Sequence, residues 1–389
     1  MNAEIEIPFG EMNISVYFDS RQFQLPNSGF EEFHTATAGQ ATSDEPNNWH
    51  SFMSCTGPFA GIVSSVPHTF ISEDVRPGSA GAKSVLVKSG KVLGFVVANG
   101  TITTGQLSAA AMSATDPKNN AFIDLTNEAK DANGDPFYTR LVSLPDSVSL
   151  WVKFKQGEAV PEHPYATMTA VITDGSYYQE PADKDYNDII VAKAAHATIE
   201  STGEWQEIKV PFDYASYTEK MPKAILVTIS TNADPGQGTG NDELYVDDMK
   251  LVYSSRLSDI QVNGATIPGF DKDKYAYEYT FEPGTMPTIE EIADNIIYQE
   301  DGKETITAMN IDAQQNVVTI LAISADLPET HAYTVAFKEI TTGIENIPNR
   351  NDKVQAVYNL NGQKVDTMKA GQVYITKYAD GKTVKNIKK

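Results

Sequence analysis

The stretch DELYVDDMKLVYSSRL (residues 242–257) has the pattern of a β-strand interrupted by two adjacent carboxylates. Strand-forming residues, among them Val246 and Leu251, lie on both sides of Asp247 and Asp248, although aspartate is depleted in strands. Because successive strand residues point to opposite faces, one of the two aspartates is expected to face the interior. A buried carboxylate is tolerated when it is paired or bound to a metal ion. The stretch therefore predicts a strand whose aspartates have a partner elsewhere in the chain.

The composition of the whole chain is typical of a β-rich protein with many turns. Its 389 residues are 41% hydrophobic and include 26 glycines and 20 prolines. Helical periodicity is nearly absent, and the possible helices are short, at residues 103–112, 119–130 and 289–295. Short runs of β-branched and aromatic residues between turn residues predict strands. The clearest of these runs are residues 84–88, 92–98, 146–155, 166–174, 204–212 and 223–231.

The order of these runs predicts an all-β fold with more than one domain. The largest domain is a jelly-roll β-sandwich over residues 23–253. Residues 1–22 precede it as a leading strand or as the remnant of an upstream segment. Residues 254–340 have the length and strand pattern of an Ig-like β-sandwich. Residues 341–389 are predicted to hold a polar linker, TTGIENIPNRND, and a small C-terminal β-meander with a basic tail.

The charge balance limits the class of partner. Thirty basic and 52 acidic residues give a net charge of −22, which argues against nucleic acid and anionic membranes as partners. A neutral ligand or a divalent cation is compatible with this charge. The single cysteine, Cys55, excludes a disulfide framework and a cysteine-based zinc site, and its apolar neighbours predict a buried thiol.

The sequence contains no recognisable targeting segment. The N-terminus, MNAEIEIPFGEM, has neither the basic region nor the apolar core of a signal peptide. No run approaches the roughly 18 apolar residues of a membrane-spanning helix. We therefore expect either a cytoplasmic protein or the mature or trimmed form of an exported one, and the features below favour the second.

Five motifs fall in order along the first domain: LPNSGFEEF, NNWHSF, DSVSLWVKFK, GEWQEIKVPFDY and NDELYVDDMKLVY. Together they resemble the "putative carbohydrate metabolism domain" family, surface and secreted proteins of Bacteroidetes. The resemblance covers residues 23–253, and the same opening and closing motifs are similar to carbohydrate-binding-module jelly rolls. It implies a glycan context and a location that is secreted or on the outer-membrane surface.

Two further stretches resemble modules of exported proteins. LSDIQVNGATIPGFDKDKYAYEY, within residues 254–339, is similar to cadherin-like or Ig-like β-sandwiches. The tail, from GIENI through VYNLNGQKV to GKTVKNIKK, resembles the C-terminal sorting-type segment of proteins that cross the outer membrane. These likenesses imply a spacer module and an export signal after the first domain.

The resemblance also implies a metal site for the double-aspartate strand. In carbohydrate-binding jelly rolls, the Glu of the opening GFE and an Asp of the closing strand often share a structural Ca²⁺, an ion that takes about six to eight oxygen ligands. Glu31 and Asp247 are the matching residues here, so we expect them to bind one Ca²⁺ together with backbone carbonyls. The alternative is an aspartate at a strand edge that accepts hydrogen bonds from loop amides, with its neighbour solvated.

Sugar binding needs flat aromatic rings that stack on pyranose faces, and polar groups for the hydroxyls. Within DSVSLWVKFK, Trp151 lies on the face opposite to Val148 and Phe154, so it is a candidate stacking residue; otherwise a loop or the leading strand covers it. Trp49, in EPNNWHSF, is a second candidate, with packing under the jelly roll as the alternative. Trp205 begins the strand EWQEIKVPF and is expected to be a packing residue.

The segment ITDGSYYQEP (172–181) is a further candidate for ligand binding. Tyr177 and Tyr178 are adjacent aromatic residues in a turn next to Asp174. Loops at one end of a sandwich commonly carry function. The alternative is one buried and one exposed tyrosine, which strand alternation alone would produce.

Known catalytic and metal-binding motifs are absent from the sequence. DANGDP (131–136) places Asp131 and Asp135 at ligand positions of an EF-hand loop, but Pro136 and Val142 stand where that motif needs Gly and Glu, so we expect an ordinary loop. The six histidines are scattered without a metal-ligand spacing, and HExxH and GxSxG motifs are missing. Glycoside hydrolysis needs only two carboxylates, so catalysis stays open, although absence of catalysis is favoured.

The sequence thus predicts a non-catalytic, glycan-binding surface or secreted protein of a polysaccharide-utilisation context, with a polysaccharide or oligosaccharide as partner. Two alternatives stay open. One is a glycoside hydrolase that uses two carboxylates, for which loss of hydrolysis on mutating one acid would be diagnostic. The other is a structural or adhesive protein that binds other cell-surface proteins, which a large exposed apolar patch without an aromatic cleft would favour.

Overall fold

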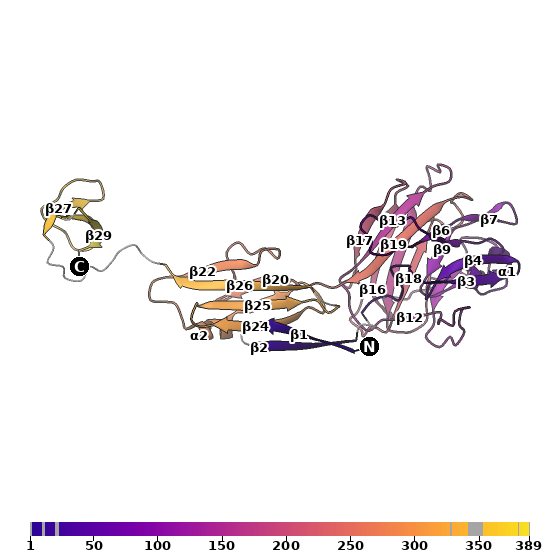
Figure 1. The fold of residues 1–389 in the computed structure, drawn as a ribbon, viewed down its shortest axis with the longest axis horizontal. Helices are drawn as coiled ribbons and strands as arrows, with labels where there is room; N and C mark the ends of the chain where they lie inside the picture. Colours follow the sequence, from indigo (N-terminus) through magenta and orange to yellow (C-terminus); the bar gives the residue numbers. More distant parts are fainter. Residues whose placement is uncertain are drawn as a thin grey trace. The chain divides into compact units, whose positions relative to one another are not determined.

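The computed structural model describes residues 2–9, 12–19, 23–326, 329–340, 353–379 and 381–388. Nearly all regular structure in this part of the chain is β-strand, which confirms the predicted all-β class (Figure 1). The helices that it contains are short: η2, a 3₁₀ helix (Phe52–Ser54), α1 (Ala60–Val63) and α2 (Ile289–Asn295). No helix among the described residues is long and apolar enough to cross a membrane.

Two antiparallel five-stranded sheets form a β-sandwich in the first part of the chain (Figure 1). The first sheet has the order β17-β13-β19-β6-β5, with the strands Gln206–Pro211, Ser147–Lys155, Glu243–Val252, Ser84–Lys88 and Thr69–Ser72. The second has the order β12-β18-β14-β16, and β9 also pairs with β18. Its strands are Thr139–Arg140, Ala224–Ser230, Ala166–Thr173, Ile190–Ile199 and, for β9, Thr101–Thr103.

The core lies between these two sheets and follows from strand alternation. In β13, every second residue from Val148 to Phe154 is fully buried, because side chains of one parity point to one face of a strand. They pack in one cluster with residues of the second sheet such as Met168 and Val227. The face of β13 that carries Trp151 therefore points away from the core.

Three small sheets complete this part of the chain. β3 (Phe33–Ala38) pairs with β4 (Ala41–Pro46), and β7 (Gly90–Val92) pairs with β8 (Val96–Ala98). The third has the order β10-β11-β15, with the strands Gln106–Ser108, Asn120–Ile123 and Tyr178–Glu180.

Three predicted elements differ from the structure, and one predicted helix is confirmed. The single strand predicted at residues 92–98 is a hairpin, because Leu93 and Gly94 adopt positive φ angles of 52° and 79° and reverse the chain. The helices predicted at residues 103–112 and 119–130 are wrong, since β10 and β11 pair there as strands. The helix predicted at 289–295 is confirmed as α2.

The wrong helices have a tertiary cause. A Cβ added at Gly105 would lie 2.1 Å from the carbonyl oxygen of Phe122, so the two backbones approach closely. That close approach and the ladder between β10 and β11 require extended chains, and tertiary pairing outweighs the helix propensity of the alanines at 109–111.

The remaining strands form four further groups. β20 lies between β21 and β23, and a four-stranded sheet has the order β22-β26-β25-β24, in which β22 and β26 are parallel. The C-terminal strands β27, β28 and β29 form the predicted antiparallel meander. β1 pairs with β2. The bounds of these strands are Leu257–Val262 (β20), Ala265–Thr266 (β21), Ile297–Glu300 (β23), Ala276–Phe281 (β22), Thr330–Glu339 (β26), Val317–Ile323 (β25), Ile306–Asp312 (β24), Val354–Asn359 (β27), Val373–Tyr378 (β28), Thr383–Ile387 (β29), Asn2–Phe9 (β1) and Met12–Asp19 (β2).

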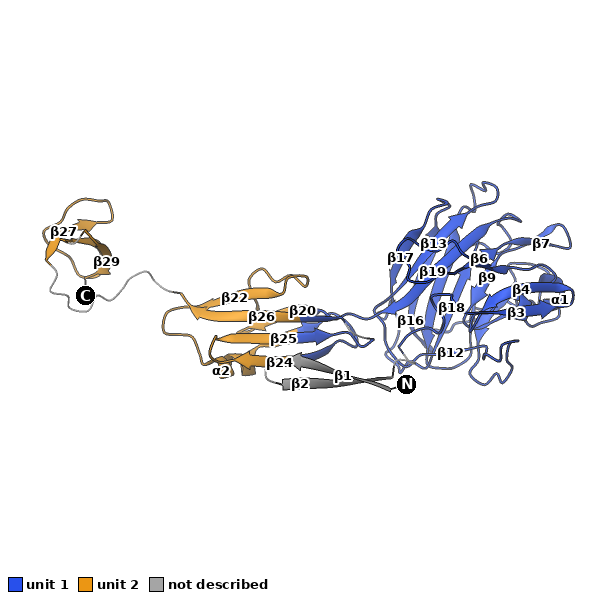
Figure 2. Cartoon of the chain, in the orientation of Figure 1, with its two compact units in different colours: residues 1–258, 299–308, 321–331 blue, residues 259–298, 309–320, 332–389 orange. Residues whose placement is uncertain are grey.

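The chain divides into two compact units (Figure 2). Unit 1 consists of Met1–Ser258, Gln299–Ala308 and Leu321–His331, and unit 2 of Asp259–Tyr298, Met309–Ile320 and Ala332–Lys389. The sandwich built from the two five-stranded sheets belongs to unit 1. The domain boundaries predicted from the sequence, and the jelly-roll and Ig-like classes, remain predictions. The predicted linker at 341–352 lies outside the described residues.

The single cysteine is expected to react slowly in the folded protein. Cys55 packs against a cluster that contains Leu107 and Tyr178, and burial raises the pKa of its thiol from 9.0 to about 12. Because the thiolate is the reactive form and its fraction falls tenfold per pKa unit, alkylation near pH 8 should be about a thousandfold slower than in the unfolded chain. The rate should rise about tenfold with each unit of pH. Mass spectrometry after iodoacetamide treatment, with and without urea, measures this ratio, and equal rates would contradict it.

Candidate functional site

The two adjacent aspartates of β19 form a β-bulge. Trp151 of β13 pairs with Asp247, whereas Ser149 pairs with Lys250, so two residues of β19 lie opposite a single residue of β13. Asp248 has a φ of 41°, a left-handed conformation that aspartate adopts more readily than most residues. Its backbone N donates a hydrogen bond to Oδ1 of Asp247 at 2.8 Å. A bulge bends the strand and redirects side chains, which explains why this strand accommodates two consecutive carboxylates.

The segment between β5 and β6 contacts both aspartates. Asp247 is fully buried, and its Oδ2 accepts a hydrogen bond from the backbone N of Arg76 at 2.9 Å. Burial raises the pKa of this carboxyl. Oδ2 of Asp248 accepts hydrogen bonds from Nε of Arg76 at 2.5 Å and from Oγ of Ser79 at 3.0 Å. In the structure, the partner of the double aspartate is therefore Arg76 and its loop.

Glu31, the other residue of the predicted Ca²⁺ site, contacts the same loop. Its carboxylate accepts hydrogen bonds from the backbone N of Ala82 at 3.0 and 3.1 Å and from the backbone N of Lys83 at 3.0 Å. Glu31 and Asp247 thus both accept hydrogen bonds from loop amides. For Asp247 this agrees with the alternative that the sequence left open, whereas its neighbour Asp248 is paired with Arg76 and is not solvated as that alternative expected. Their binding of Ca²⁺ remains a prediction.

The outer face of the first sheet carries a cross-strand row of aromatic, apolar and charged side chains. Lys153 of β13 pairs with Tyr245 of β19. Tyr245 in turn pairs with Leu86 of β6, and Leu86 pairs with Phe70 of β5. All four side chains are partly exposed. Because directly opposite residues on neighbouring strands share one face, these residues form a continuous surface across four strands.

Lys153 lies at the centre of a small network at one end of this row. Its Nζ lies 4.2 Å from the ring centroid of Tyr245 and 5.5 Å from that of Trp205, and the two rings meet edge to face, with centroids 6.4 Å apart. Lys153 also forms an ion pair with Asp74, whose Oδ1 accepts a hydrogen bond from Nε1 of Trp205 at 3.0 Å. The hydrogen bond from Lys153 holds the pKa of Asp74 below its ordinary value. Charge and hydrogen bonds therefore orient both aromatic rings.

Trp151 lies on the same outer face, as its position in the strand predicts, and it is partly exposed. It pairs across strands with Glu207 of β17. The guanidinium of Arg76 lies over its ring, 5.4 Å from the centroid. One cation thus links the double aspartate of β19 to this ring, and cation–π contacts of this kind restrict ring orientation.

A pocket of about 430 Å³ adjoins the β5 end of the row. Its lining includes Phe70 and Lys88 of the first sheet together with Pro67, Lys91 and Asn241 from neighbouring segments. Phe70 belongs to both the row and the pocket, so the two are contiguous. The volume lies within the range of small-ligand sites.

The tyrosines predicted in the segment 172–181 lie on a different sheet. Tyr178 is buried in β15 and donates a hydrogen bond to Glu180. Tyr177 is 41% exposed, and its ring stacks on that of Phe122 with centroids 5.8 Å apart. Asp174 accepts a hydrogen bond from the amide two residues later, at 2.9 Å. This is the arrangement of one buried and one exposed tyrosine, and it does not bring these residues together with Trp151.

Trp49 packs inside the protein. Its side chain is fully buried, and its ring centroid lies 5.1 Å from that of Phe30. Its Nε1 donates a hydrogen bond to the carbonyl oxygen of Pro26 at 3.2 Å. No face of this ring is available to stack on a sugar, so the packing alternative describes Trp49.

Sequence reasoning missed the network around Lys153. Trp205, expected to pack, is partly exposed on the outer face. The signal was present, since Trp205 and Glu207 alternate with the buried Ile208, and the same alternation placed Trp151 outside. No sequence pattern pointed to Asp74, because it lies in the loop between β5 and β6 and not in a strand whose alternation could be analysed.

The sequence matches no protein-family model, and no curated protein sequence matches it. Among solved structures it is similar to a crystal structure described as a "putative glycoside hydrolase" from Bacteroides vulgatus, at 16% identity and a TM-score of 0.38, over 64% of this chain and 95% of that one. A protein of the same description from Bacteroides thetaiotaomicron also has 16% identity and a TM-score of 0.38, over 60% and 70% of the two chains. A cyclase from Fischerella sp. TAU has 11% identity and a TM-score of 0.21, over 65% of this chain and 100% of that one. At these identities and TM-scores, the likenesses carry no argument about function.

Proposed function

We propose that this protein is a non-catalytic glycan-binding protein, secreted or held on the outer-membrane surface, and that it binds glycans on the outer face of the sheet β17-β13-β19-β6-β5. One observation carries the proposal: Trp205 and Tyr245 are held edge to face around the ion pair of Lys153 and Asp74, with Trp151 on the same face. Aromatic rings of this kind offer apolar surface with a fixed geometry, and the adjacent charged groups offer hydrogen bonds to hydroxyls. The location rests on the sequence resemblance.

The charges of this face favour a neutral glycan. Three basic groups on or beside it are paired with a carboxylate: Lys153 with Asp74, Arg76 with Asp248, and Lys88 with Glu243. No net positive patch is thus left in these pairs to attract an acidic sugar, and the chain as a whole has a net charge of −22. Paired charged groups still exchange hydrogen bonds with sugar hydroxyls, and the apolar pyranose faces match the exposed rings.

The proposal is tested with the full chain on an array of neutral and acidic glycans, followed by calorimetry on a neutral hit. Trp205→Ala is expected to weaken binding at least tenfold, because truncation of an aromatic residue that anchors a ligand commonly costs about 2 kcal/mol. Trp151→Ala is expected to weaken it in the same direction. Circular dichroism confirms that each variant is folded.

Tyr177→Ala is the matched control, since Tyr177 is an exposed aromatic residue on a different sheet. It is expected to bind as the unmodified protein does. An array without any bound glycan, or an equal loss of affinity in Tyr177→Ala and Trp205→Ala, would contradict the proposal that this face binds glycans. Release of reducing ends from the bound glycan would instead favour the glycoside-hydrolase alternative.

A structural Ca²⁺ held by Glu31 and Asp247 is kept as part of the proposal. Its support is that residues 76–83 contact both carboxylates, each of which has further lone pairs beyond its amide hydrogen bonds. In the same calorimetric series, Ca²⁺ is titrated into chelator-stripped protein and into Glu31→Gln. Heat that the variant lacks is the expected result, and no heat with millimolar Ca²⁺ would count against this site.

A further inference from the structure

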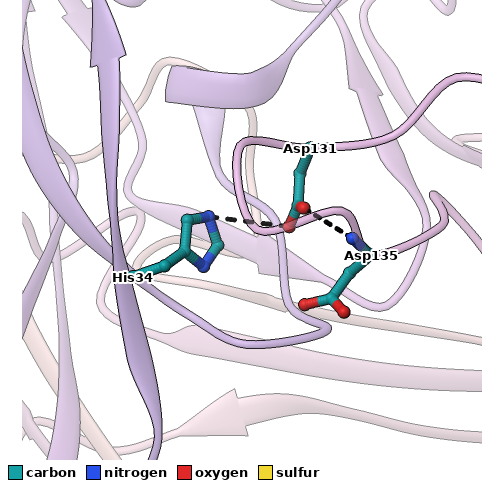
Figure 3. Close-up of side chains that lie close together, drawn as sticks. All are labelled: His34, Asp131 and Asp135. Atoms are coloured by element: carbon teal, nitrogen blue, oxygen red, sulfur yellow. Dashed lines mark hydrogen bonds and ion pairs between the residues drawn. The ribbon is translucent and has the colours of Figure 1, made fainter.

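Five side chains of metal-binding type, two histidines and three carboxylates, gather beside the hairpin β3-β4. His34 lies in β3 and Glu45 in β4. His50 follows the hairpin and forms a β-bridge to β9, while Asp131 and Asp135 come from the loop after β11. Figure 3 shows His34 pointing from its strand toward the loop that carries the two aspartates.

The ligand atoms of these residues converge. Nε2 of His34 lies 3.5 Å from Oδ2 of Asp131 and 3.7 Å from Oε2 of Glu45. Nε2 of His50 lies 3.4 Å from the same oxygen of Asp131. His34, Asp131 and Asp135 each offer one ligand atom, and these atoms all lie within 4.8 Å of one another. Ligand atoms around a tetrahedral Zn²⁺ with bonds of about 2.0–2.1 Å are separated by about 3.3–3.4 Å, close to the three shortest of these distances.

The second oxygen of each central carboxylate is held by hydrogen bonds. Oδ1 of Asp131 accepts from the backbone N of Asp135 at 2.8 Å. Oε1 of Glu45 accepts from the backbone N of Ser51 at 2.7 Å and from its Oγ at 2.5 Å. These bonds orient Oδ2 of Asp131 and Oε2 of Glu45 toward the histidines. Outer partners of this type are what orient the ligands of metal sites.

The tautomer of His34 follows from its own partner. Its Nδ1 lies 3.1 Å from Oδ1 of Asn47, and because an amide oxygen only accepts, Nδ1 carries the proton. In the neutral imidazole, Nε2 of His34 is then a lone pair that faces two carboxylate oxygens. Three acceptors that face one another repel, and a cation between them removes the repulsion.

The converging atoms have no other partner among the described residues. The side chains of Glu45, His50 and Asp131 are 0% exposed, and that of His34 is 8% exposed. Nε2 of both histidines, Oε2 of Glu45 and Oδ2 of Asp131 are all buried without a hydrogen-bond partner in the described part of the chain. Separations of 3.4–3.7 Å are too long for hydrogen bonds between them. Several orphaned polar atoms aimed at one place would be costly without a ligand.

The charge of the cluster also calls for a cation. Glu45, Asp131 and Asp135 contribute three carboxylates, and among the described ion pairs only the two histidines lie next to them. Buried carboxylates are stable when they are paired or bound to a metal ion. A dication would compensate most of this charge.

We propose that this cluster binds one Zn²⁺ ion through Nε2 of His34, Nε2 of His50 and Oδ2 of Asp131, with Asp135 or Glu45 as the fourth ligand. Imidazole nitrogen selects Zn²⁺ and its neighbours in the transition series over Ca²⁺ and Mg²⁺, and four protein ligands are typical of structural zinc sites. The ion joins three segments that are far apart in the sequence, so it stabilises the fold. This site shares no residue with the proposed glycan-binding face or with the predicted Ca²⁺ pair.

The test uses the full chain, expressed with zinc and purified without chelator. Elemental analysis is expected to find about one Zn²⁺ per chain. Removal of the metal should lower the melting temperature by several degrees, and Zn²⁺ but not Ca²⁺ should restore it, because a ligand of the folded state stabilises that state. Reconstitution with Co²⁺ should produce the visible absorption of a tetrahedral cobalt site.

Asp131→Asn and His50→Gln are expected to lose the metal and the cobalt absorption. Their matched controls should keep both: Asp116→Asn, an aspartate that also accepts a backbone hydrogen bond, and His68→Gln, a fully buried histidine outside the cluster. Comparison of Asp135→Asn with Glu45→Gln identifies the fourth ligand as the one whose loss weakens Zn²⁺ binding at least tenfold.

Unmodified protein that holds no zinc, gives no cobalt absorption and melts at the same temperature with and without Zn²⁺ would overturn the proposal. The cluster would then consist of imidazolium–carboxylate pairs. Equal metal loss in the control variants would overturn the assignment of the ligands. These measurements on the unmodified chain decide the question even where a ligand variant does not fold.

Discussion

Trp49→Ala lowers the free energy of unfolding of unit 1 by about 3–5 kcal/mol, the usual cost of truncating a buried tryptophan. The side chain is 0% exposed and packs in the main core cluster next to Phe30. Alanine would leave a cavity in that cluster and would remove the indole hydrogen bond to the part-buried carbonyl oxygen of Pro26. The next residue along the chain is His50, whose Nε2 belongs to the proposed zinc cluster. Because loss of the Trp49 ring would loosen this part of the chain, the affinity for Zn²⁺ is expected to fall as well.

Urea unfolding followed by tryptophan fluorescence measures this effect, because the remaining probes, Trp151 and Trp205, both lie in unit 1. Trp49→Phe retains most of the packing and should cost roughly half as much or less. Tyr177→Ala, which removes an exposed ring, should change the stability by less than about 1 kcal/mol. A loss in Trp49→Ala as small as that of Tyr177→Ala would show that this ring does not pack in the core.

Asp242→Ala is expected to destabilise unit 1 by about 2–4 kcal/mol, because it removes a fully buried carboxylate that accepts several hydrogen bonds. Asp242 precedes β19 and is 0% exposed. Its Oδ1 accepts hydrogen bonds from the backbone N of Gly157 at 2.9 Å and from Oγ1 of Thr239 at 2.5 Å, and its Oδ2 accepts from the backbone N of Thr239 at 2.7 Å. One carboxylate thus fixes the loop that ends at Asn241, which lines the pocket beside the aromatic row.

The same unfolding assay measures the loss in Asp242→Ala, and glycan binding provides a second reading. Asp242→Asn retains one oxygen and should lose less stability. Asp174→Ala is the matched control, since its carboxylate accepts an amide hydrogen bond in a partly exposed turn, and it should cost less than about 1 kcal/mol. If Asp242→Ala and Asp174→Ala unfold at the same urea concentration, the buried network does not stabilise the loop.

Local pattern was sufficient for six strands of the two main sheets, which are β6, β13, β14, β17, β18 and β19, and for the inner and outer faces of β13. The runs at 146–155 and 166–174 were predicted from sequence and are β13 and β14, and the outward position of Trp151 followed from alternation. This works because side-chain direction in a strand depends only on the parity of the residue. The pattern failed at 103–112, where a close approach of two backbones overrides helix propensity.

The roles of particular side chains needed more than the pattern. Trp49 and Trp205 are both aromatic residues near strands, yet one is buried in the core and the other lies on the outer face. Burial depends on which other segment covers a residue, and that segment comes from elsewhere in the chain. Asp242 likewise receives its hydrogen bonds from residues that no local motif connects to it.

The sequence by itself determined the all-β class, six strands of the main sandwich and the face of Trp151, because these depend on composition and on a two-residue period. Only the tertiary structure brought Lys153, Asp74 and Trp205 together, and only it placed His34, His50 and Asp131 around one point. The histidines have no metal-ligand spacing along the chain, and the loop at 131–136 fails the EF-hand motif. Convergence of distant residues depends on how strands and loops pair in space, and a local sequence period carries no information about that pairing.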